Sequence, residues 1–114
     1  MILFKPEHIK LIQKGIKIQT RRIWKKPRCK PGSIHKAKTE IFSKEFFAEL
    51  FIIDVRKEHL LDISEKDAFR EGGYTREEFL RKWDEINPKN PSSTNSEIYV
   101  VTFNPTQKSI RRFS

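Results

Sequence analysis

The sequence predicts an α+β domain built on a small, partly open β-barrel with short helices packed at its ends. Two observations favour this fold. A strand-like apolar segment, Phe46–Arg56, is followed by residues with helical spacing from Ser64 to Ile86. The strands that the sequence suggests, five to six in number, are too few for a sandwich and do not alternate with helices as βαβ units do. With 114 residues the chain is expected to form one domain, 1–114.

The first third of the chain predicts one helix and two strands. Residues 6–14 favour a short helix, because Pro6 suits a first helical position and Gly15 a helix end. Residues 16–24 are rich in β-branched side chains and predict a strand crowded with cations. A loop with Pro27, Pro31 and Gly32 follows, and a strand is expected from 33 to 41.

Phe46–Arg56 is the clearest strand of the sequence. Alternate residues from Phe46 to Ile52 are apolar, and so are most of those between them, including Phe51 and Ile53. A strand that is apolar on both faces is expected to be covered on both sides.

The later residues predict two helices and two strands. Ser64–Arg70 has the pattern of a helix that ends at Gly72-Gly73, and Thr75 with Glu78 three residues later forms a capping box. Phe79, Leu80, Trp83 and Ile86 give that second helix its buried face. Strands are then expected over 98–103 and 107–113, the last carrying Arg111 and Arg112.

Charge is the first indication of function. The formal net charge is +9, and residues 1–38 hold twelve Lys or Arg and one acidic residue, a net +11. Residues 58–85 hold five basic and nine acidic residues, a net −4. A concentrated basic patch attracts phosphate backbones, although a basic surface that only promotes solubility is an equal alternative.

Several classes of function are disfavoured. No apolar run is long enough to span a membrane, and the apolar start is too short for a signal peptide, so a cytoplasmic protein is expected. The single Cys29 forms no internal disulfide, and the three His have no ligand-like spacing. We therefore expect no metal, no cofactor and no membrane partner.

Gly15–Arg22 brings a lysine, a hydroxyl and two arginines together. On an ideal strand Thr20 and Arg22 share one face, and Lys17, Gln19 and Arg21 the other. A buried Lys can serve as base for a neighbouring Thr, and an Arg can hold an anion bidentately. The alternative is an edge strand with solvated cations, which spacing alone favours.

Glu71 is the second candidate, because a carboxylate at a helix C-terminus is electrostatically misplaced and suggests a cationic partner. Its alternative is an exposed side chain at a frayed helix end. Phe113, Trp24 and Tyr74 are candidates for base stacking, with core packing favoured for Trp24.

The residues resemble the ASCH domain family over most of the chain. The motif Gly15-x-Lys17-x-x-Thr20-x-Arg22 after a short helix is similar to the family's opening motif. Further likenesses follow in order: the Pro31-Gly32 turn, the segment from Leu61 to Gly72, the stretch from Glu78 to Trp83, and Tyr99 to Phe103. The resemblance implies a PUA-like β-barrel with an RNA- or nucleotide-binding cleft beside the first strand.

Some members of that family remove the acetyl group from N4-acetylcytidine. The resemblance places their catalytic Lys, Thr and Glu at Lys17, Thr20 and Glu71, with Lys17 deprotonating Thr20 for attack on the amide carbonyl and Glu71 assisting proton transfer. The chain departs from the family at Ile18, where many members have Thr, and at Ser33, where Asp is usual. Because Lys17 and Thr20 are three residues apart, this scheme requires a bulge or turn near Ile18.

The functional hypothesis is an RNA-binding module with a nucleotide-sized cleft beside a basic surface. The nucleic-acid-binding residues predicted are Arg21, Arg22, Lys25, Lys26, Arg28 and Lys30. The alternatives are an amidohydrolase acting on an acylated nucleoside, a metal-independent ribonuclease, and a protein-interaction domain of a ribonucleoprotein.

Overall fold

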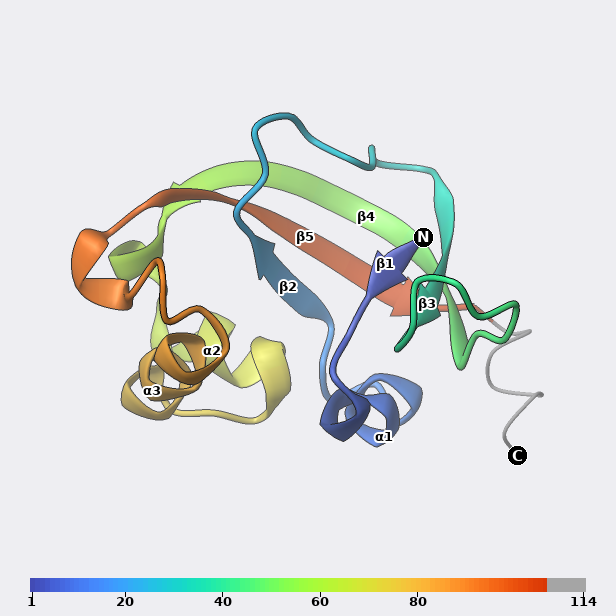
Figure 1. Ribbon diagram of the computed structural model, residues 1–114, viewed down its shortest axis with the longest axis horizontal. Helices are drawn as coiled ribbons and strands as arrows, with labels where there is room; N and C mark the ends of the chain where they lie inside the picture. The colour runs from blue at the N-terminus through green and yellow to red at the C-terminus, as the bar shows by residue number, and fades with distance from the viewer. Residues whose placement is uncertain (107–114) are drawn as a thin grey trace.

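The computed structural model of the protein describes residues 1–106, whose arrangement Figure 1 shows. The five strands of this part of the chain are β1 (Ile2–Leu3), β2 (Gln19–Arg22), β3 (Ile34–Lys38), β4 (Ala48–His59) and β5 (Glu97–Pro105). The helices are α1 (Ile9–Gln13), α2 (Glu65–Gly72) and α3 (Arg76–Ile86), with 3-10 turns η1 (Pro6–His8), η2 (Leu60–Asp62) and η3 (Ser92–Thr94). The predicted final strand, 107–113, lies outside the described residues.

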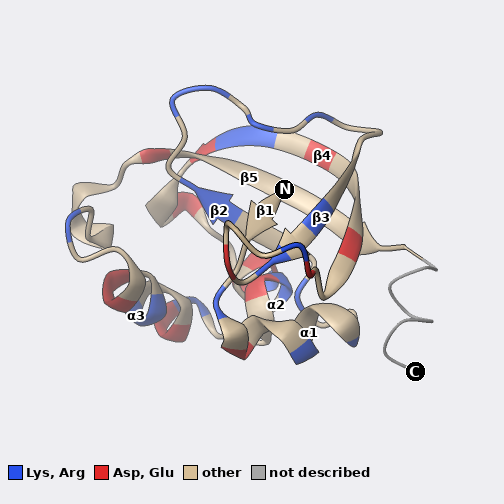
Figure 2. Ribbon diagram, turned by 45° about the vertical axis from the view of Figure 1, so that its right-hand side comes forward, with Lys and Arg blue, Asp and Glu red and all other residues tan. Residues whose placement is uncertain are grey.

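The strands form one curled, half-barrel sheet in the order β1-β3-β4-β5-β2. β1 is parallel to β3, and the other neighbours are antiparallel. The long strands β4 and β5 form its spine, and in Figures 1 and 2 the α-helices lie together on the inner side of its curve. The α+β fold with a small barrel-like sheet and short helices, as predicted, is confirmed.

The strand β4 contains a β-bulge and is exposed on one face, and this exposure overturns one expectation. Ile52 pairs with Phe103 and Asp54 with Thr102, so Ile53 is an extra residue without a partner. Leu50 and Ile52 are fully buried, but Phe51 and Ile53 are 42% and 45% exposed. The prediction that β4 is covered on both faces is therefore wrong, because the helices cover one side of the sheet only.

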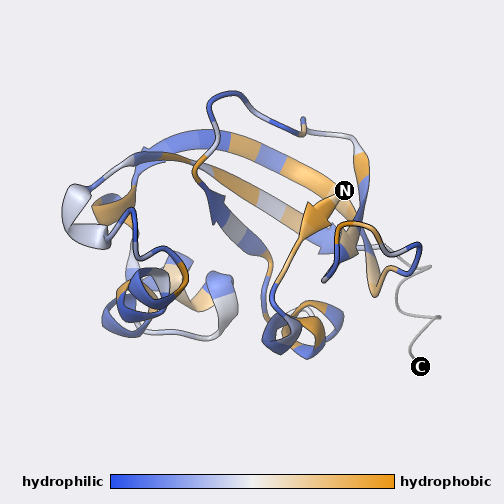
Figure 3. Cartoon of the chain, in the orientation of Figure 1, coloured by the Kyte–Doolittle hydropathy of each residue, from blue (hydrophilic) through white to orange (hydrophobic). Residues whose placement is uncertain are grey.

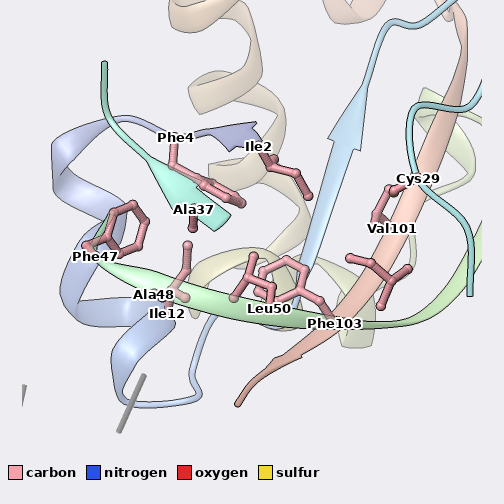
Figure 4. Close-up of a cluster of buried hydrophobic side chains, with 11 residues drawn as sticks. Ile2, Phe4, Ile12, Cys29, Ala37, Phe47, Ala48, Leu50, Val101 and Phe103 are labelled. Carbon is pink, nitrogen blue, oxygen red and sulfur yellow. The ribbon is translucent and has the colours of Figure 1, made fainter. Parts of the chain in front are cut away.

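The core has two clusters, one at each end of the spine. The first joins β1, α1, β3, β4 and β5, and Figure 4 shows its rings from Phe4, Phe47 and Phe103 packed around the small side chains of Ala37 and Ala48. The second joins η2, α2, α3 and β5 through buried residues that include Leu60, Ile63, Phe79 and Trp83. Full burial of each large apolar side chain contributes roughly 1.5–3 kcal/mol.

The two later helices begin where the sequence indicates. The Ser64 hydroxyl accepts a hydrogen bond from the Asp67 N–H, and Thr75 and Glu78 form the predicted capping box. α2 ends at Gly72, where the sequence indicates, and Gly73, with φ of 80°, closes it by donating to the Phe69 carbonyl. Glu71 therefore lies in the last turn of the helix, as expected.

The segment before β2 is a turn, although the sequence predicts a strand over 16–24. The backbone N–H groups of Ile16 and Lys17 both donate to the Leu11 carbonyl, and that of Ile18 donates to the Arg70 carbonyl. These amides bond to two helices and not to a neighbouring strand, so β2 begins only at Gln19. The predicted helix over 6–14 is likewise divided, into η1 and α1, and the short strand β1 had not been predicted.

Replacing Thr75 by Ala is expected to lower the free energy of unfolding by about 1 kcal/mol, because the Glu78 N–H loses its side-chain acceptor. Urea unfolding followed by circular dichroism measures the change. Thr94→Ala is the matched control, since Thr94 is exposed and lies in η3. Equal losses in the two variants would show that the capping box does not stabilise α3.

Candidate functional site

A pocket of about 460 Å³ opens between β1, η1, β2, the C-terminal end of α2 and α3. Its apolar wall includes the rings of Phe4, Tyr74, Phe79 and Trp83. Its polar wall comes mainly from β2 and the turn before it, and Figure 3 shows β2 as a hydrophilic strand at the edge of the sheet. Lys17, Thr20 and Glu71, which the sequence singles out, all line this one pocket.

Glu71 has the cationic partner that its position suggests. The Lys17 Nζ donates to Glu71 Oε1 at 2.9 Å and to the Glu71 carbonyl at 2.8 Å. A third bond, at 2.9 Å, goes to the Gln19 carbonyl. The ammonium therefore lies at the negative end of α2, where a cation is stabilised, and compensates for the carboxylate in the same turn.

Burial lowers the pKa of Lys17 below its ordinary value, while the negative charge of Glu71 counteracts part of this effect. Both side chains are almost fully buried, with 3% and 4% exposed. A lysine in such a position gives up a proton more readily than one in water. This is the condition that a general base must meet.

Arg21 is the centre of the polar network, and the expectation that it lies on the phosphate-facing surface is not met. Its guanidinium is fully buried and donates to Glu71 Oε2 at 2.9 Å and to Gln19 Oε1 at 3.0 Å. Nη2 also donates to Glu58 Oε1 and to Asp67 Oδ2, each at 3.1 Å, and Nε donates to Glu58 Oε1 at 3.2 Å. Arg21 thus holds Glu71 in place and has no hydrogen left for a phosphate.

Two further arginines complete the network around Asp67. Arg56 binds Glu58 at 2.8 Å and Asp67 at 2.9 Å, and Arg70 binds the other oxygen of Asp67 at 2.8 Å. Burial acts to raise the pKa of Asp67, but these cationic partners outweigh it and hold that pKa below its ordinary value. The alternative of an edge strand with solvated cations is therefore wrong for Lys17 and Arg21.

Thr20 and Arg22 share a face of β2, as predicted. The Arg22 Nε donates to Thr20 Oγ1 at 2.9 Å, and Nη2 donates to the Leu3 carbonyl at 2.6 Å. The guanidinium carbon lies 4.9 Å from the centre of the Phe4 ring. Lys17, whose three bonds go to other oxygens, does not contact the Thr20 hydroxyl in this arrangement.

His8 belongs to the pocket, although the sequence had given no reason to include it. It is 8% exposed, and its Nε2 has no hydrogen-bond partner among the described residues. Burial, with the positive charge of Lys17, lowers the pKa of His8 to about 4. The imidazole is therefore neutral at pH 7. The sequence did not indicate Glu58 or Asp67 as site residues. It indicated Gln19 only through the strand face that Gln19 shares with Arg21.

The loop after β2 carries the remaining predicted binding residues. Lys25, Lys26, Arg28 and Lys30 are all exposed, and Figure 2 shows the positive charge that follows β2 into this loop. The Arg28 guanidinium carbon lies 6.0 Å from the centre of a Trp24 ring. We call these four residues the basic loop.

The aromatic candidates separate into two groups. Trp24 packs against the first core cluster and contacts Tyr99, as core packing predicts, whereas Tyr74 lines the pocket. Phe113 lies outside the described residues, as do Arg111 and Arg112. Within residues 1–106 no cluster of His, Cys, Asp or Glu is arranged to hold a metal, and no helix there is long and apolar enough to cross a membrane.

Comparison with family models and with curated proteins gives no match. Several solved structures resemble the chain, among them the following three. The ASCH domain of Lactobacillus crispatus JV V101 has 16% identity and a TM-score of 0.61, over 85% of this chain and 69% of that one. A mutant of the ASCH protein of Zymomonas mobilis has 12% identity and a TM-score of 0.60, over 93% and 69%.

A protein of Enterococcus faecalis V583 described by the family model DUF984 has 18% identity and a TM-score of 0.63, over 88% of this chain and 70% of that one. At identities this low, the structural similarity establishes a common fold alone. The chain therefore has the α+β fold of the ASCH domain structures, as its half-barrel sheet and helices independently indicate.

Proposed function

We propose that the chain is an ASCH domain protein that binds RNA or a nucleotide, with one base in the pocket and neighbouring phosphates on the basic loop. The observation that carries this proposal is the pocket itself. It has about 460 Å³, aromatic rings on one wall and buried polar groups on the other, and it lies beside the strand that leads into the basic loop.

The size and lining of the pocket suit a planar base. Ligand sites commonly have about 300–1,000 Å³, and are mostly apolar with a few polar groups that orient the ligand. Proteins that recognise single-stranded RNA place unstacked bases against aromatic rings and bind their edges with polar groups. Tyr74 and Trp83 supply rings, and Thr20 and Arg22 supply polar groups.

The basic loop suits a phosphate backbone. Its four cations are exposed and have no salt bridges among the described residues, so their charges are available to a polyanion. Asp67 and Glu71 of α2 and Glu58 of β4 are neutralised by Arg21, Arg56 and Arg70 and do not oppose it. Such contacts release counterions and make affinity depend on salt.

Replacing Lys25, Lys26 and Lys30 together by Gln is expected to weaken binding of a single-stranded RNA. It should also reduce the slope of log affinity against log salt by about 2, since each phosphate contact on a single strand contributes about 0.7. Fluorescence anisotropy between about 50 and 200 mM salt measures both quantities. Arg28 is kept because it stacks on Trp24.

The matched control replaces Lys66, Arg81 and Lys89 by Gln. These three are exposed and lie outside the pocket lining, and their loss gives the same net charge, because +9 falls by three in either variant. Equal losses of affinity in the two variants would show that overall charge, and not the basic loop, determines the affinity. An undetectable affinity of the wild type at low salt would contradict RNA binding itself.

A second function, hydrolysis of an acylated nucleoside, is favoured by one specific observation: Lys17, Thr20 and Glu71 line the same pocket, and Lys17 contacts Glu71. In this reaction a neutral Lys17 takes the Thr20 proton, and the Thr20 oxygen forms a bond to the acyl carbon. The amide bond then breaks, and the leaving amine takes a proton that Glu71 can relay. Water next releases acetate and restores the hydroxyl.

The buried state of Lys17 supports its part in this scheme, because desolvation favours the neutral amine. The turn over 16–18 supplies the departure from ideal strand geometry that the scheme requires. Before attack, Lys17 must turn from Gln19 and Glu71 toward the hydroxyl. The ribonuclease alternative has no observation of its own in its favour.

Release of cytidine from N4-acetylcytidine is the reaction to measure, by chromatography. Thr20→Val is expected to lower kcat/KM by at least about 100-fold, because it removes the nucleophile at constant side-chain volume. Thr20→Ser, which keeps a hydroxyl, should retain most of the rate. Lys17→Ala and Glu71→Ala should be inactive. If wild type and Thr20→Val are equally slow, hydrolysis of this substrate is excluded and binding remains the function.

A further inference from the structure

Arg22 is a cation of the pocket without a carboxylate partner. Its hydrogen bonds go to the Thr20 hydroxyl and the Leu3 carbonyl, both uncharged. Within residues 1–106 it forms no salt bridge, whereas Lys17 and Arg21 each pair with Glu71. Arg22 is therefore the one of these three pocket cations whose charge is not balanced by a direct contact.

The environment of Arg22 makes that imbalance costly. The side chain is partly buried against the Phe4 ring, and burial lowers the pKa of Arg22 below its ordinary value. A charge withdrawn from water without a contacting counter-ion loses hydration, which the two hydrogen bonds and the charge of Glu71 replace only in part. The two bonds that fix the guanidinium use Nε and Nη2, and Nη1 makes no hydrogen bond to any described residue.

His8 gives a second, independent observation in the same pocket. Its Nε2 is buried and unpartnered in the part of the chain that the structure describes. Buried polar atoms are nearly always hydrogen-bonded, and a buried polar atom left without a partner costs about 1–3 kcal/mol. His8 is neutral at pH 7, with the cations Lys17, Lys82 and Arg22 nearby, so it can act as a hydrogen-bond donor without adding charge.

We propose that Arg22 and His8 form an anion subsite that binds the phosphate of a nucleotide, so that the ligand is a phosphorylated nucleotide or an RNA phosphodiester and not a free nucleoside. This inference rests on the proposed function, since it concerns the same pocket. Arg22 supplies the charge and its free Nη1 donor, and His8 supplies Nε2–H. Lys82, which also lines the pocket, is already paired with Glu7 at 2.9 Å and contributes less.

A phosphate fits these two residues better than other groups of the ligand. It offers several acceptor oxygens, so one phosphate can accept from a guanidinium and from an imidazole together. Occupied, the subsite would pair the unbalanced Arg22 and satisfy His8 in one step. Anion binding would then remove the cost of leaving these two groups without partners, which adds to the binding free energy.

Calorimetric titration with the four ribonucleosides and with their 5′- and 3′-monophosphates tests the proposal. The wild type is expected to bind at least one monophosphate about tenfold more tightly than its nucleoside, the scale of one charge-assisted hydrogen bond. Arg22→Gln should abolish this preference, so that the ratio of monophosphate affinity to nucleoside affinity falls to about one. Arg81→Gln, an exposed arginine outside the pocket lining, should keep it.

His8→Leu gives a second readout that a merely structural role would not produce. It should weaken monophosphate binding about fivefold or more while leaving the thermal unfolding midpoint unchanged or higher, because an unpartnered polar atom leaves the interior. A lower midpoint with unchanged affinity would overturn the role of His8.

The outcomes separate the two proposals. A wild type that binds nucleosides and monophosphates equally would overturn the anion subsite and leave the nucleotide pocket standing. A wild type that binds neither would overturn both. The wild-type ratio and His8→Leu decide the matter even if Arg22→Gln fails to fold.

Discussion

The carboxylate of Glu71 between two buried cations is the interaction on which the site depends. One oxygen binds Lys17 and the other binds Arg21, each at 2.9 Å. Lys17 comes from the turn before β2, and Arg21 comes from β2 itself. This single carboxylate therefore joins the end of α2 to β2 and to the turn before it. Removing one partner of such a cluster leaves a buried charge unpaired, which is strongly destabilising. Paired charges therefore hold the pocket wall together at the point where its candidate catalytic residues lie.

This arrangement divides the cations from Lys17 to Lys30 into three groups. Lys17 and Arg21 are neutralised inside the protein, the basic loop is exposed, and Arg22 lies between them without a counter-ion. The net charge of +9 describes none of these differences. Of these cations, only the loop and Arg22 keep charge for a ligand, which favours phosphate along the basic loop and at the wall of the pocket that Arg22 forms.

The sequence predicts those features that depend on local rules. The capping box at Thr75, the cationic partner of Glu71 and the faces shared by Thr20 with Arg22 and by Gln19 with Arg21 follow from spacing and helix electrostatics, and all are observed. The burial of Arg21 does not follow, because it requires Glu58 and Asp67, from residues far along the chain.

The same limit explains the other corrections. The turn over 16–18 depends on carbonyls of α1 and α2, and the exposure of Phe51 and Ile53 depends on how many helices reach the outer face of the sheet. The hydrophobic pattern within one segment does not predict which distant segments will bond to it or cover it. His8 was missed for a related reason: a lone histidine in a short helix has no pattern, and its meaning appears only when its neighbours leave it unpartnered.

Phosphate binding and hydrolysis are coupled in this pocket through the hydrogen bond between Arg22 and Thr20. The guanidinium donates to the Thr20 oxygen, so that oxygen keeps its own hydrogen for a base or a ligand. A neighbouring positive charge also stabilises an alkoxide, which favours deprotonation. An anion that binds to Arg22 would weaken this effect by neutralising the charge. Phosphate in the subsite and a reactive Thr20 therefore oppose each other, and a pocket selected for the phosphate is expected to be a poor hydrolase.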